Sequence, residues 1–239
     1  MGFLKKFFRN VFRDGTGNRP PSSFEQLSEA ELETHLNVAK YGEFILSEAI
    51  RPAYSLEVVP RAGFRHDCYQ DDQSKSKVPV LMAAVTLPEL FDTFLDMLDP
   101  LGNVVDVVLE TSHNRDQRGH VDLYREHIDL PVLKSILYDY EELLTHDGCT
   151  GIAVLNPQIP LEVQFDEHKL IIAYGHELRE FEGVLRDRCL PCDDQMKFIT
   201  EAEHVHSSSD TFASAFEELK MRLGIEPGYG RDDENHRFV

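Results

Sequence analysis

The spacing of apolar residues alternates along the chain between the period of strands and the period of helices. Short apolar or alternating runs predict strands, and apolar residues that recur every three or four positions predict helices. Between residues 78 and 155 these patterns predict six elements: strand Val78–Val85, helix Pro88–Leu98, strand Val104–Thr111, strand His120–Ile128, helix Leu130–Leu144 and strand Gly151–Leu155. The order β-α-β-β-α-β is typical of a ferredoxin-like unit, in which two helices cover one face of an antiparallel sheet.

A second and smaller unit is predicted for residues 156–227. The turn Asp166–Lys169 lies between two short apolar runs and predicts a hairpin, and the elements after it complete the order β-β-α-β-α. The predicted elements are strands Leu161–Phe165 and Leu170–Tyr174, helix Leu178–Leu185, strand Met196–Val205 and helix Phe212–Leu223. Together the two units predict an α+β fold, in which they lie side by side or share one sheet at Gly151–Leu155.

Residues 24–77 are predicted to lead into these units, mainly as helix. Ser28 and Glu31 have the spacing of a capping box, and the apolar residues after them predict one or two helices that end at Ile50. The segment Tyr54–Val59 is rich in strand-forming residues and predicts a short strand.

The two ends of the chain are predicted to be separate from these units. Residues 1–13 have apolar and basic residues on opposite sides of one short helix. Residues 14–23, rich in Gly, Pro and Ser, predict a flexible linker, and residues 228–239 predict a polar tail. The apolar face of the helix is Phe3, Leu4, Phe7, Phe8, Val11 and Phe12, and its basic face is Lys5, Lys6, Arg9 and Arg13.

The charge of the chain makes this N-terminal helix stand out. The chain has 24 Lys and Arg against 43 Asp and Glu, a formal net charge of -19, which disfavours nucleic acid as a partner. Residues 1–13 hold four cations and no acidic residue, as in helices that lie on anionic membranes. We therefore expect the helix to attach the protein to an anionic membrane surface, or to dock on an acidic protein surface, its own body included.

The cysteine content and the hydropathy set the expected environment. Four cysteines and 41% hydrophobic residues indicate a core that needs no disulfides, which favours a reducing, cytoplasmic setting. No apolar run approaches the ~20 residues of a spanning helix, and the N-terminus lacks a signal-peptide pattern. Peripheral attachment is the expected relation to a membrane, and the helix Phe212–Leu223 or a sheet edge could serve as the contact surface of a homo-oligomer.

Cys189 and Cys192 form a C-x-x-C pair, which is typical of a redox dithiol or of half a zinc site. The pair follows a predicted helix, so its sulfurs face the negative end of the helix dipole, which disfavours a reactive thiolate. His204 and His206 add two imidazoles on one side of a predicted strand. The favoured interpretation is a plain structural role for all four residues, without a cofactor, and a zinc site formed by them is the alternative.

A different metal site draws on acidic residues nearby. Asp166, Glu167 and His168 lie in the predicted turn, and Glu201 and Glu203 precede the histidine pair His204 and His206. Carboxylates and imidazoles together bind hydrolytic metals, which lower the pKa of a bound water. Because 43 acidic residues and 11 histidines bring such groups together by chance, solvated surface is the competing interpretation.

Enzyme signatures are missing from the sequence, which has no nucleophile elbow and no phosphate-binding loop. We therefore predict an acidic, non-catalytic binding or regulatory module, attached to a membrane surface or a partner through residues 1–13. The alternative is a metal-dependent hydrolase or metal-stabilised enzyme with a site between residues 166 and 206. Stoichiometric zinc in the purified protein would favour the alternative.

Overall fold

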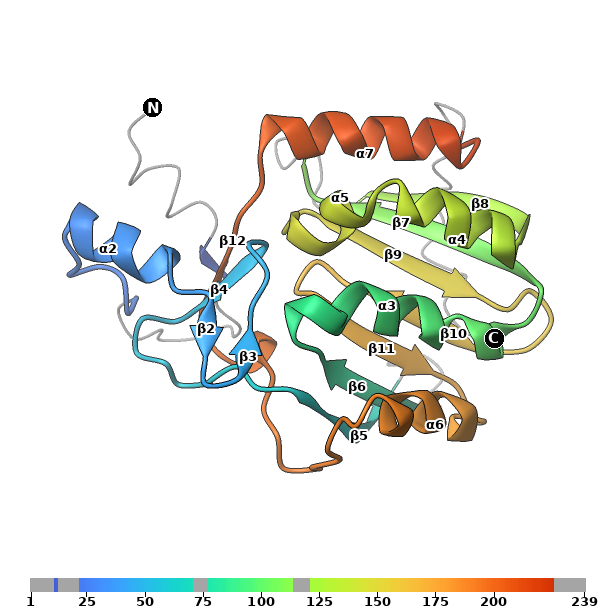
Figure 1. Ribbon diagram of the computed structural model, residues 1–239, viewed down its shortest axis with the longest axis horizontal. Coiled ribbons are helices and arrows are strands. Elements are labelled where there is room, and N and C mark those ends of the chain that lie inside the picture. Colours follow the sequence, from blue (N-terminus) through green and yellow to red (C-terminus); the bar gives the residue numbers. More distant parts are fainter. Residues whose placement is uncertain (1–10, 13–21, 71–76, 114–120, 226–239) are drawn as a thin grey trace.

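A seven-stranded antiparallel sheet is the largest element of the computed structural model, which describes residues 22–70, 77–113 and 121–225 and the backbone of residues 11–12 (Figure 1). The strands follow one another across the sheet in the order β5-β6-β11-β10-β9-β7-β8. They are β5 (Gly63–Gln70), β6 (Lys77–Ala84), β7 (Val104–Thr111), β8 (Val121–Asp129), β9 (Thr150–Leu155), β10 (Glu162–Phe165) and β11 (Leu170–Tyr174).

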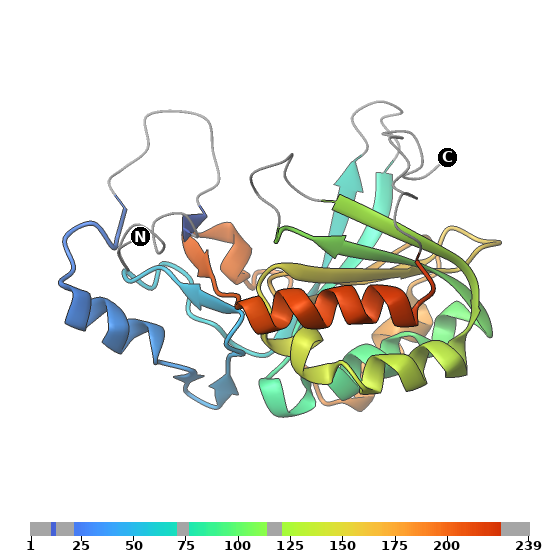
Figure 2. The same ribbon diagram turned by 90° about the horizontal axis from the view of Figure 1, so that it is seen from above.

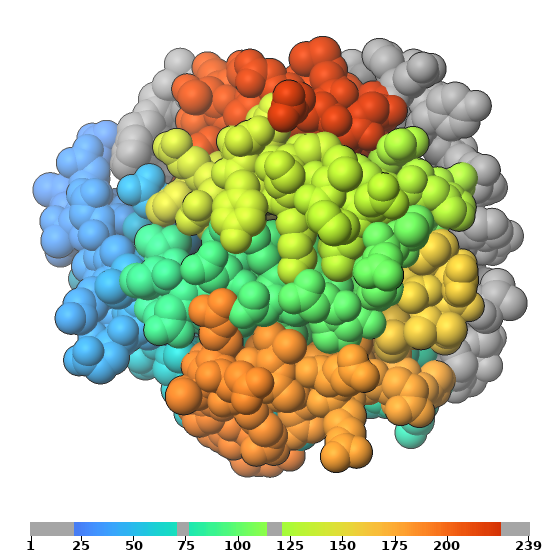
Figure 3. All heavy atoms as spheres, turned by 45° about the vertical axis from the view of Figure 1, so that its right-hand side comes forward, coloured from blue at the N-terminus to red at the C-terminus, as the bar shows by residue number. Residues whose placement is uncertain are grey.

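Five helices cover one face of this sheet. Figure 2 shows them all on the same side, and in Figure 3 they cross that face as successive bands. They are α3 (Leu87–Met97), α4 (Leu130–Tyr138), α5 (Glu141–His146), α6 (Arg179–Asp187) and α7 (Asp210–Arg222). The mixed helix and sheet content confirms the predicted α+β class.

The central helix α3 illustrates how the apolar pattern builds this layer. Pro88 occupies the first turn, where its missing N–H leaves no helical hydrogen bond unmade. The apolar residues that recur at helical spacing behind it are buried against the sheet. Phe94 stacks on Phe165 of β10 with ring centroids 4.8 Å apart, and both side chains are buried. Burying an aromatic side chain of this size stabilises the fold by about 1.5–3 kcal/mol.

The strand pairing differs from the predicted ferredoxin-like unit, although the six elements predicted for residues 78–155 occur in the predicted order. The strands that α3 connects, β6 and β7, are separated by three strands, and two of these come from residues 162–174. Of the two strand pairs that helices connect within residues 78–155, only β8 and β9, connected through α4 and α5, are separated by a single strand, β7.

A local turn accounts for the difference. Asn156, directly after β9, accepts hydrogen bonds at Oδ1 from the backbone N–H groups of Gln158 (2.7 Å) and Ile159 (3.0 Å), and its own N–H donates to Leu161 O (2.9 Å). The chain therefore reverses at once, and β10 pairs antiparallel with β9. As a result, the two predicted units share one continuous sheet through β9.

A smaller layer lies at one end of the large sheet (Figure 1). It contains the three-stranded sheet β1-β12-β4, a two-stranded hairpin and one helix. These elements are β1 (Val11–Phe12), α2 (Glu29–Leu36), β2 (Lys40–Tyr41), β3 (Phe44–Ile45), β4 (Ile50–Pro52) and β12 (His204–His206). Phe44, Ile50 and Phe198 belong to a second core, which packs on side chains of β6 and β11. The layer thus covers part of the sheet face that the helices leave open.

Three of the elements predicted for this layer are wrong, two in extent and one because it does not form. Ser28 and Glu31 form the predicted capping box, but the helix ends at Leu36, and short strands replace the helix expected up to residue 50. Gly42, at φ +62°, forms the turn between β2 and β3. Residues 54–59 form no strand, and of the predicted strand 196–205 only the end belongs to a strand, because residues 199–201 form a single helical turn before it.

The predicted N-terminal helix is wrong at its last apolar residues. Val11 and Phe12 form β1, which pairs antiparallel with β12 so that Val11 lies opposite Val205 and Phe12 opposite His204. Residues 1–10 and 13, most of the linker 14–23 and the tail 228–239 lie outside the described residues. None of the described helices combines the length and the apolar character needed to cross a membrane.

Candidate metal centre

The four predicted zinc ligands do not come together. Cys189 and Cys192 follow α6 at the β5 edge of the large sheet, whereas His204 and His206 lie on β12 in the small layer. Backbone hydrogen bonds of 2.9 Å, from the N–H of Phe64 to Pro191 O and from that of Asp193 to Phe64 O, hold the Cys192 segment against β5. The C-x-x-C pair is therefore kept away from the histidine pair.

Three histidines do converge where the two layers meet. His204 and His206 point to the same side of β12, and His168 reaches them from the turn between β10 and β11. The ring centroids lie 5.0 Å (His168 to His204), 4.7 Å (His168 to His206) and 5.2 Å (His204 to His206) apart. One nitrogen of each ring lies within 4.8 Å of the others. This set of residues, named the histidine centre below, was part of the predicted hydrolytic site.

The hydrogen bonds of the histidine centre determine which nitrogen of each ring carries the proton. Nδ1 of His204 lies 2.8 Å from Ala202 O, Nδ1 of His206 lies 2.6 Å from Gly148 O, and Nδ1 of His168 lies 2.8 Å from a carboxylate oxygen of Asp166. Carbonyl and carboxylate oxygens only accept, so each Nδ1 is the donor. Each neutral ring then keeps its lone pair on Nε2, which is the arrangement that supports metal-ligating histidines.

The turn between β10 and β11 holds His168 rigidly. Asp166 Oδ1 accepts hydrogen bonds from the backbone N–H groups of His168 (3.0 Å) and Leu170 (2.8 Å), while its other oxygen accepts the imidazole N–H. Burial disfavours the imidazolium form of His168, but the Asp166 carboxylate outweighs it and raises the pKa of the ring above its usual value. A single carboxylate thus forms the turn and orients the ring.

Lys169, next in the turn, brings a positive charge into the same region. Its side chain is buried, with 5% exposed, and Nζ donates a 2.8 Å hydrogen bond to Thr150 O. Burial lowers the pKa of Lys169 to about 8, although the carboxylates of Asp147, Asp166 and Glu167 oppose that shift. One ammonium therefore faces three carboxylates, and the region as a whole is negative.

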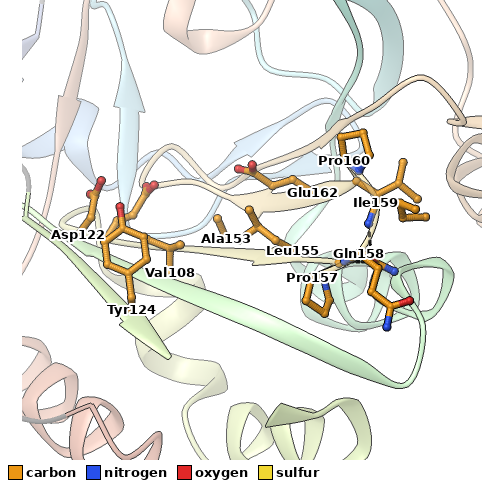
Figure 4. Close-up of a pocket in the computed structure, with 13 residues that line it drawn as sticks. Val108, Asp122, Tyr124, Ala153, Leu155, Pro157, Gln158, Ile159, Pro160 and Glu162 are labelled. Carbon is orange, nitrogen blue, oxygen red and sulfur yellow. Dashed lines mark hydrogen bonds between the residues drawn. The ribbon is translucent and has the colours of Figure 1, made fainter. Parts of the chain in front are cut away.

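An acidic groove runs from this region along the open face of the large sheet. Two adjoining hollows of about 410 and 340 Å³ share Glu110 and Asp122, and the second reaches His168 and Cys149. Figure 4 shows the first hollow, with Asp122 of β8 at one end, the loop after β9 at the other, and Ala153 between them. The carboxylates that line the two hollows are Glu110, Asp122, Glu162, Asp166 and Glu167.

The two glutamates of the predicted hydrolytic site have other roles. Glu203 accepts hydrogen bonds from the hydroxyls of Ser22 and Ser23, each at 2.6 Å, and so fixes the start of the small layer. Glu201 forms a 2.6 Å ion pair with Arg65 and accepts the backbone N–H of Phe198 at 3.0 Å. The histidine centre therefore excludes both. Its supporting carboxylate, Asp166, belongs to the turn Asp166–His168, which the sequence analysis included in the hydrolytic site.

The predicted ligand Cys192 joins a second group instead, the edge group, which consists of His66, Cys192 and Asp194. Nδ1 of His66 lies 3.1 Å from an Asp194 oxygen, and Nε2 lies 3.6 Å from an oxygen of Glu182 on α6. Burial and the Asp194 charge raise the pKa of the Cys192 thiol. A raised pKa leaves little thiolate for redox chemistry or metal binding.

Comparison of the chain with protein-family models, with curated proteins and with solved structures found no match. Its function is therefore inferred from the geometry of the described residues.

Proposed function

We propose that the protein binds a divalent metal ion, zinc or a metal of similar preference, through Nε2 of His168, His204 and His206. The observation that carries the proposal is the shared tautomer: each Nδ1 donates to an oxygen, so each neutral ring has its lone pair on Nε2, and one nitrogen of each ring lies within 4.8 Å of the others. Imidazole nitrogen suits zinc, copper and nickel, and a set of three histidines is a common zinc ligand set.

The position of the three histidines indicates what the ion would stabilise. His204 and His206 belong to the small layer and are 3% and 1% exposed, whereas His168 belongs to the large sheet. An ion bound to all three would connect the two layers, in keeping with the metal-stabilised alternative from the sequence. The surplus of carboxylates around Lys169 also favours a bound cation.

Hydrolysis is the second candidate function, and one observation favours it. His168 lines the acidic groove, so an ion on its Nε2 would adjoin a space large enough for a small substrate. Three histidine ligands leave a fourth position for water, and zinc lowers the pKa of such a water to about 7. The acidic lining favours a cationic substrate over a phosphate.

The test is the zinc content of the folded protein and of variants with one ligand removed. We expect His168→Ala, His204→Ala and His206→Ala each to bind one equivalent of zinc fewer than the wild-type protein. His176→Ala, which removes an exposed histidine, is the matched control and should keep the full content. Elemental analysis after gel filtration measures the content. A folded wild-type protein that binds no zinc would refute the proposal.

Surface attachment through the N-terminal segment remains a separate proposal. Its apolar residues and its cations Lys5, Lys6 and Arg9 still have the composition of a membrane-binding helix, while Val11 and Phe12 belong to β1. Removal of residues 1–10 therefore keeps β1 and tests attachment alone. We expect the full-length protein to co-sediment with anionic vesicles and the truncated protein to stay in solution. With neutral vesicles, neither form should sediment. Equal sedimentation of both forms would refute attachment.

A further inference from the structure

A second group of possible ligands lies beside the histidine centre. His113 follows β7, and Asp147 and Cys149 lie in the loop between α5 and β9. An imidazole nitrogen, a carboxylate oxygen and the thiol sulfur of these residues lie within 4.8 Å of one another. Gly148, between the last two, supplies the carbonyl oxygen that holds His206. One loop therefore contributes to both groups.

Two buried polar atoms in this second group lack hydrogen-bond partners among the described residues. They are Oδ1 of Asp147, whose residue is 0% exposed, and Nε2 of His113. The other carboxylate oxygen, Oδ2, accepts a 2.5 Å hydrogen bond from the Thr150 hydroxyl. Nε2 lies 3.0 Å from Oδ2, the separation of an ion pair when the ring is protonated. Buried polar atoms of this kind are rare in folded proteins, and a bound ion is one established reason for them.

The Thr111 hydroxyl allows either tautomer of His113. Nδ1 lies 2.8 Å from the Thr111 hydroxyl oxygen, which has two lone pairs and also accepts the backbone N–H of His113 at 3.2 Å. With the proton on Nδ1, the Nε2 lone pair faces the Asp147 carboxylate, and a cation bound to both would remove their repulsion; with the proton on Nε2, the same contact is an ion pair. Burial opposes the ionisation of Asp147, but His113, Ser208 and Thr150 outweigh it and lower the pKa of this carboxyl.

We propose that Nε2 of His113, Oδ1 of Asp147 and Sγ of Cys149 bind a second divalent cation. Nitrogen, oxygen and thiolate sulfur together suit zinc and cobalt(II) better than calcium or magnesium, which prefer oxygen alone. Cys149 lines the acidic groove, so the ion would reach the site from there. This site does not depend on the histidine centre, because the two share no ligand.

The edge group lacks the features on which this inference rests. Both nitrogens of His66 face carboxylates, and Asp194 already accepts the backbone N–H of His66 at 3.0 Å. Cys192 therefore serves as the matched control for Cys149.

Cobalt(II) tests the site, since a thiolate bound to cobalt gives a charge-transfer band in the near ultraviolet that imidazole ligands do not give. Cobalt(II) is added to the metal-free, full-length protein, and absorption is recorded. We expect the band in the wild-type protein, in Cys192→Ser and in His204→Ala, and its loss in Cys149→Ser. His204→Ala retains the band because only the histidine centre is disabled, so failure of one site is distinguishable from failure of the other.

Three results would overturn the proposal: no band from a folded protein, a band that survives in Cys149→Ser, or a band lost in Cys192→Ser. The wild-type chain gives a second readout if Cys149→Ser does not fold. Zinc should protect Cys149 from alkylation at least tenfold and leave the exposed Cys68 unprotected, as measured by peptide mass spectrometry. Equal alkylation of Cys149 with and without zinc would also refute the site.

Discussion

The histidine centre and the edge group each bring metal-ligating residue types within a few ångströms, yet their hydrogen bonds differ. In the histidine centre every Nδ1 donates to an oxygen, and the Nε2 atoms of His204 and His206 are buried. In the edge group both nitrogens of His66 face carboxylates, and all three members are exposed. Proximity is thus common to the two groups, and burial and the distribution of donors and acceptors separate them.

The hydrogen-bond partners of a ligand therefore decide whether it can bind metal. An imidazole between two carboxylates is stabilised as a cation without a lone pair, whereas an acceptor on Nδ1 alone fixes the proton there and places the lone pair of the neutral ring on Nε2. A search by residue type and distance selects both groups. A search by remaining lone pairs selects the histidine centre and the His113 group.

Zinc should stabilise the protein strongly through the histidine centre and not at all through the edge group. In the Cys149→Ser background, which removes a ligand of the second proposed site, zinc at about a thousandfold excess over Kd should stabilise the fold by ~4 kcal/mol. For a chain of this size that raises Tm by about 10 °C. His206→Ala should abolish the rise and His66→Ala should keep it, as measured by thermal unfolding with and without zinc. A rise lost in His66→Ala would reverse the comparison.

Glycine substitutions test the backbone beside each group. A Cβ on Gly148 would lie 2.3 Å from Ala49 O and 2.8 Å from Ser207 O, so the loop that holds His206 must shift. Gly148→Ala should lower the free energy of unfolding of the metal-free protein by about 1–3 kcal/mol and weaken zinc binding. Gly183→Ala, in α6 near the edge group, meets nothing within 4 Å and should stabilise by about 0.5–1 kcal/mol.

Urea unfolding and a zinc titration measure these two effects. Unchanged zinc affinity in Gly148→Ala would show that the Gly148 carbonyl is not needed to orient His206.

Asp166→Asn tests the carboxylate that orients His168. The amide oxygen can still accept hydrogen bonds in the turn, but it lacks the negative charge that makes the imidazole a stronger ligand. We expect zinc affinity to fall about 10–100-fold with unchanged stoichiometry. Asp194→Asn, the corresponding change in the edge group, should leave the affinity unchanged. Competition with a chelating dye measures both, and equal effects of the two substitutions would contradict the assigned role of Asp166.

The elements of the fold were predictable wherever the apolar pattern is local. The hairpin of β10 and β11, the helix α3 and the capping box of α2 all follow from residues near one another in the sequence. The strand order was not predictable, since nothing in β6 distinguishes β11 from β9 as its neighbour. The pairing of β10 with β9 depends on the tight turn that the Asn156 side chain holds through its hydrogen bonds.

The candidate sites were predictable only in part, for a similar reason. His204 and His206 are linked by strand alternation, and His168 was included because of its turn. The C-x-x-C pattern was misleading, because Cys192 is held at the β5 edge by backbone hydrogen bonds that its own sequence does not reveal. His113 and Cys149 come from segments far apart along the chain, so no spacing pattern could join them.

The smallest expected effect concerns the thiol of the edge group. Burial, followed by the charge of Asp194, raises the pKa of Cys192, while Arg186 opposes the shift. Removing the charge in Asp194→Asn should lower the pKa, increase the thiolate fraction at pH 7.5 and speed alkylation a few-fold. In the wild-type protein the alkylation rate should continue to rise with pH beyond the usual range of a thiol, because its pKa is raised.

Peptide mass spectrometry follows Cys192 and, as an internal control, Cys68, whose rate Asp194→Asn should not change. Slower alkylation of Cys192 in Asp194→Asn would mean that the carboxylate acts mainly by holding the His66 ring beside the thiol. The edge group would then be a device for activating a thiol rather than a network of ion pairs, and hydrogen-bond partners alone would no longer be enough to tell the two groups apart.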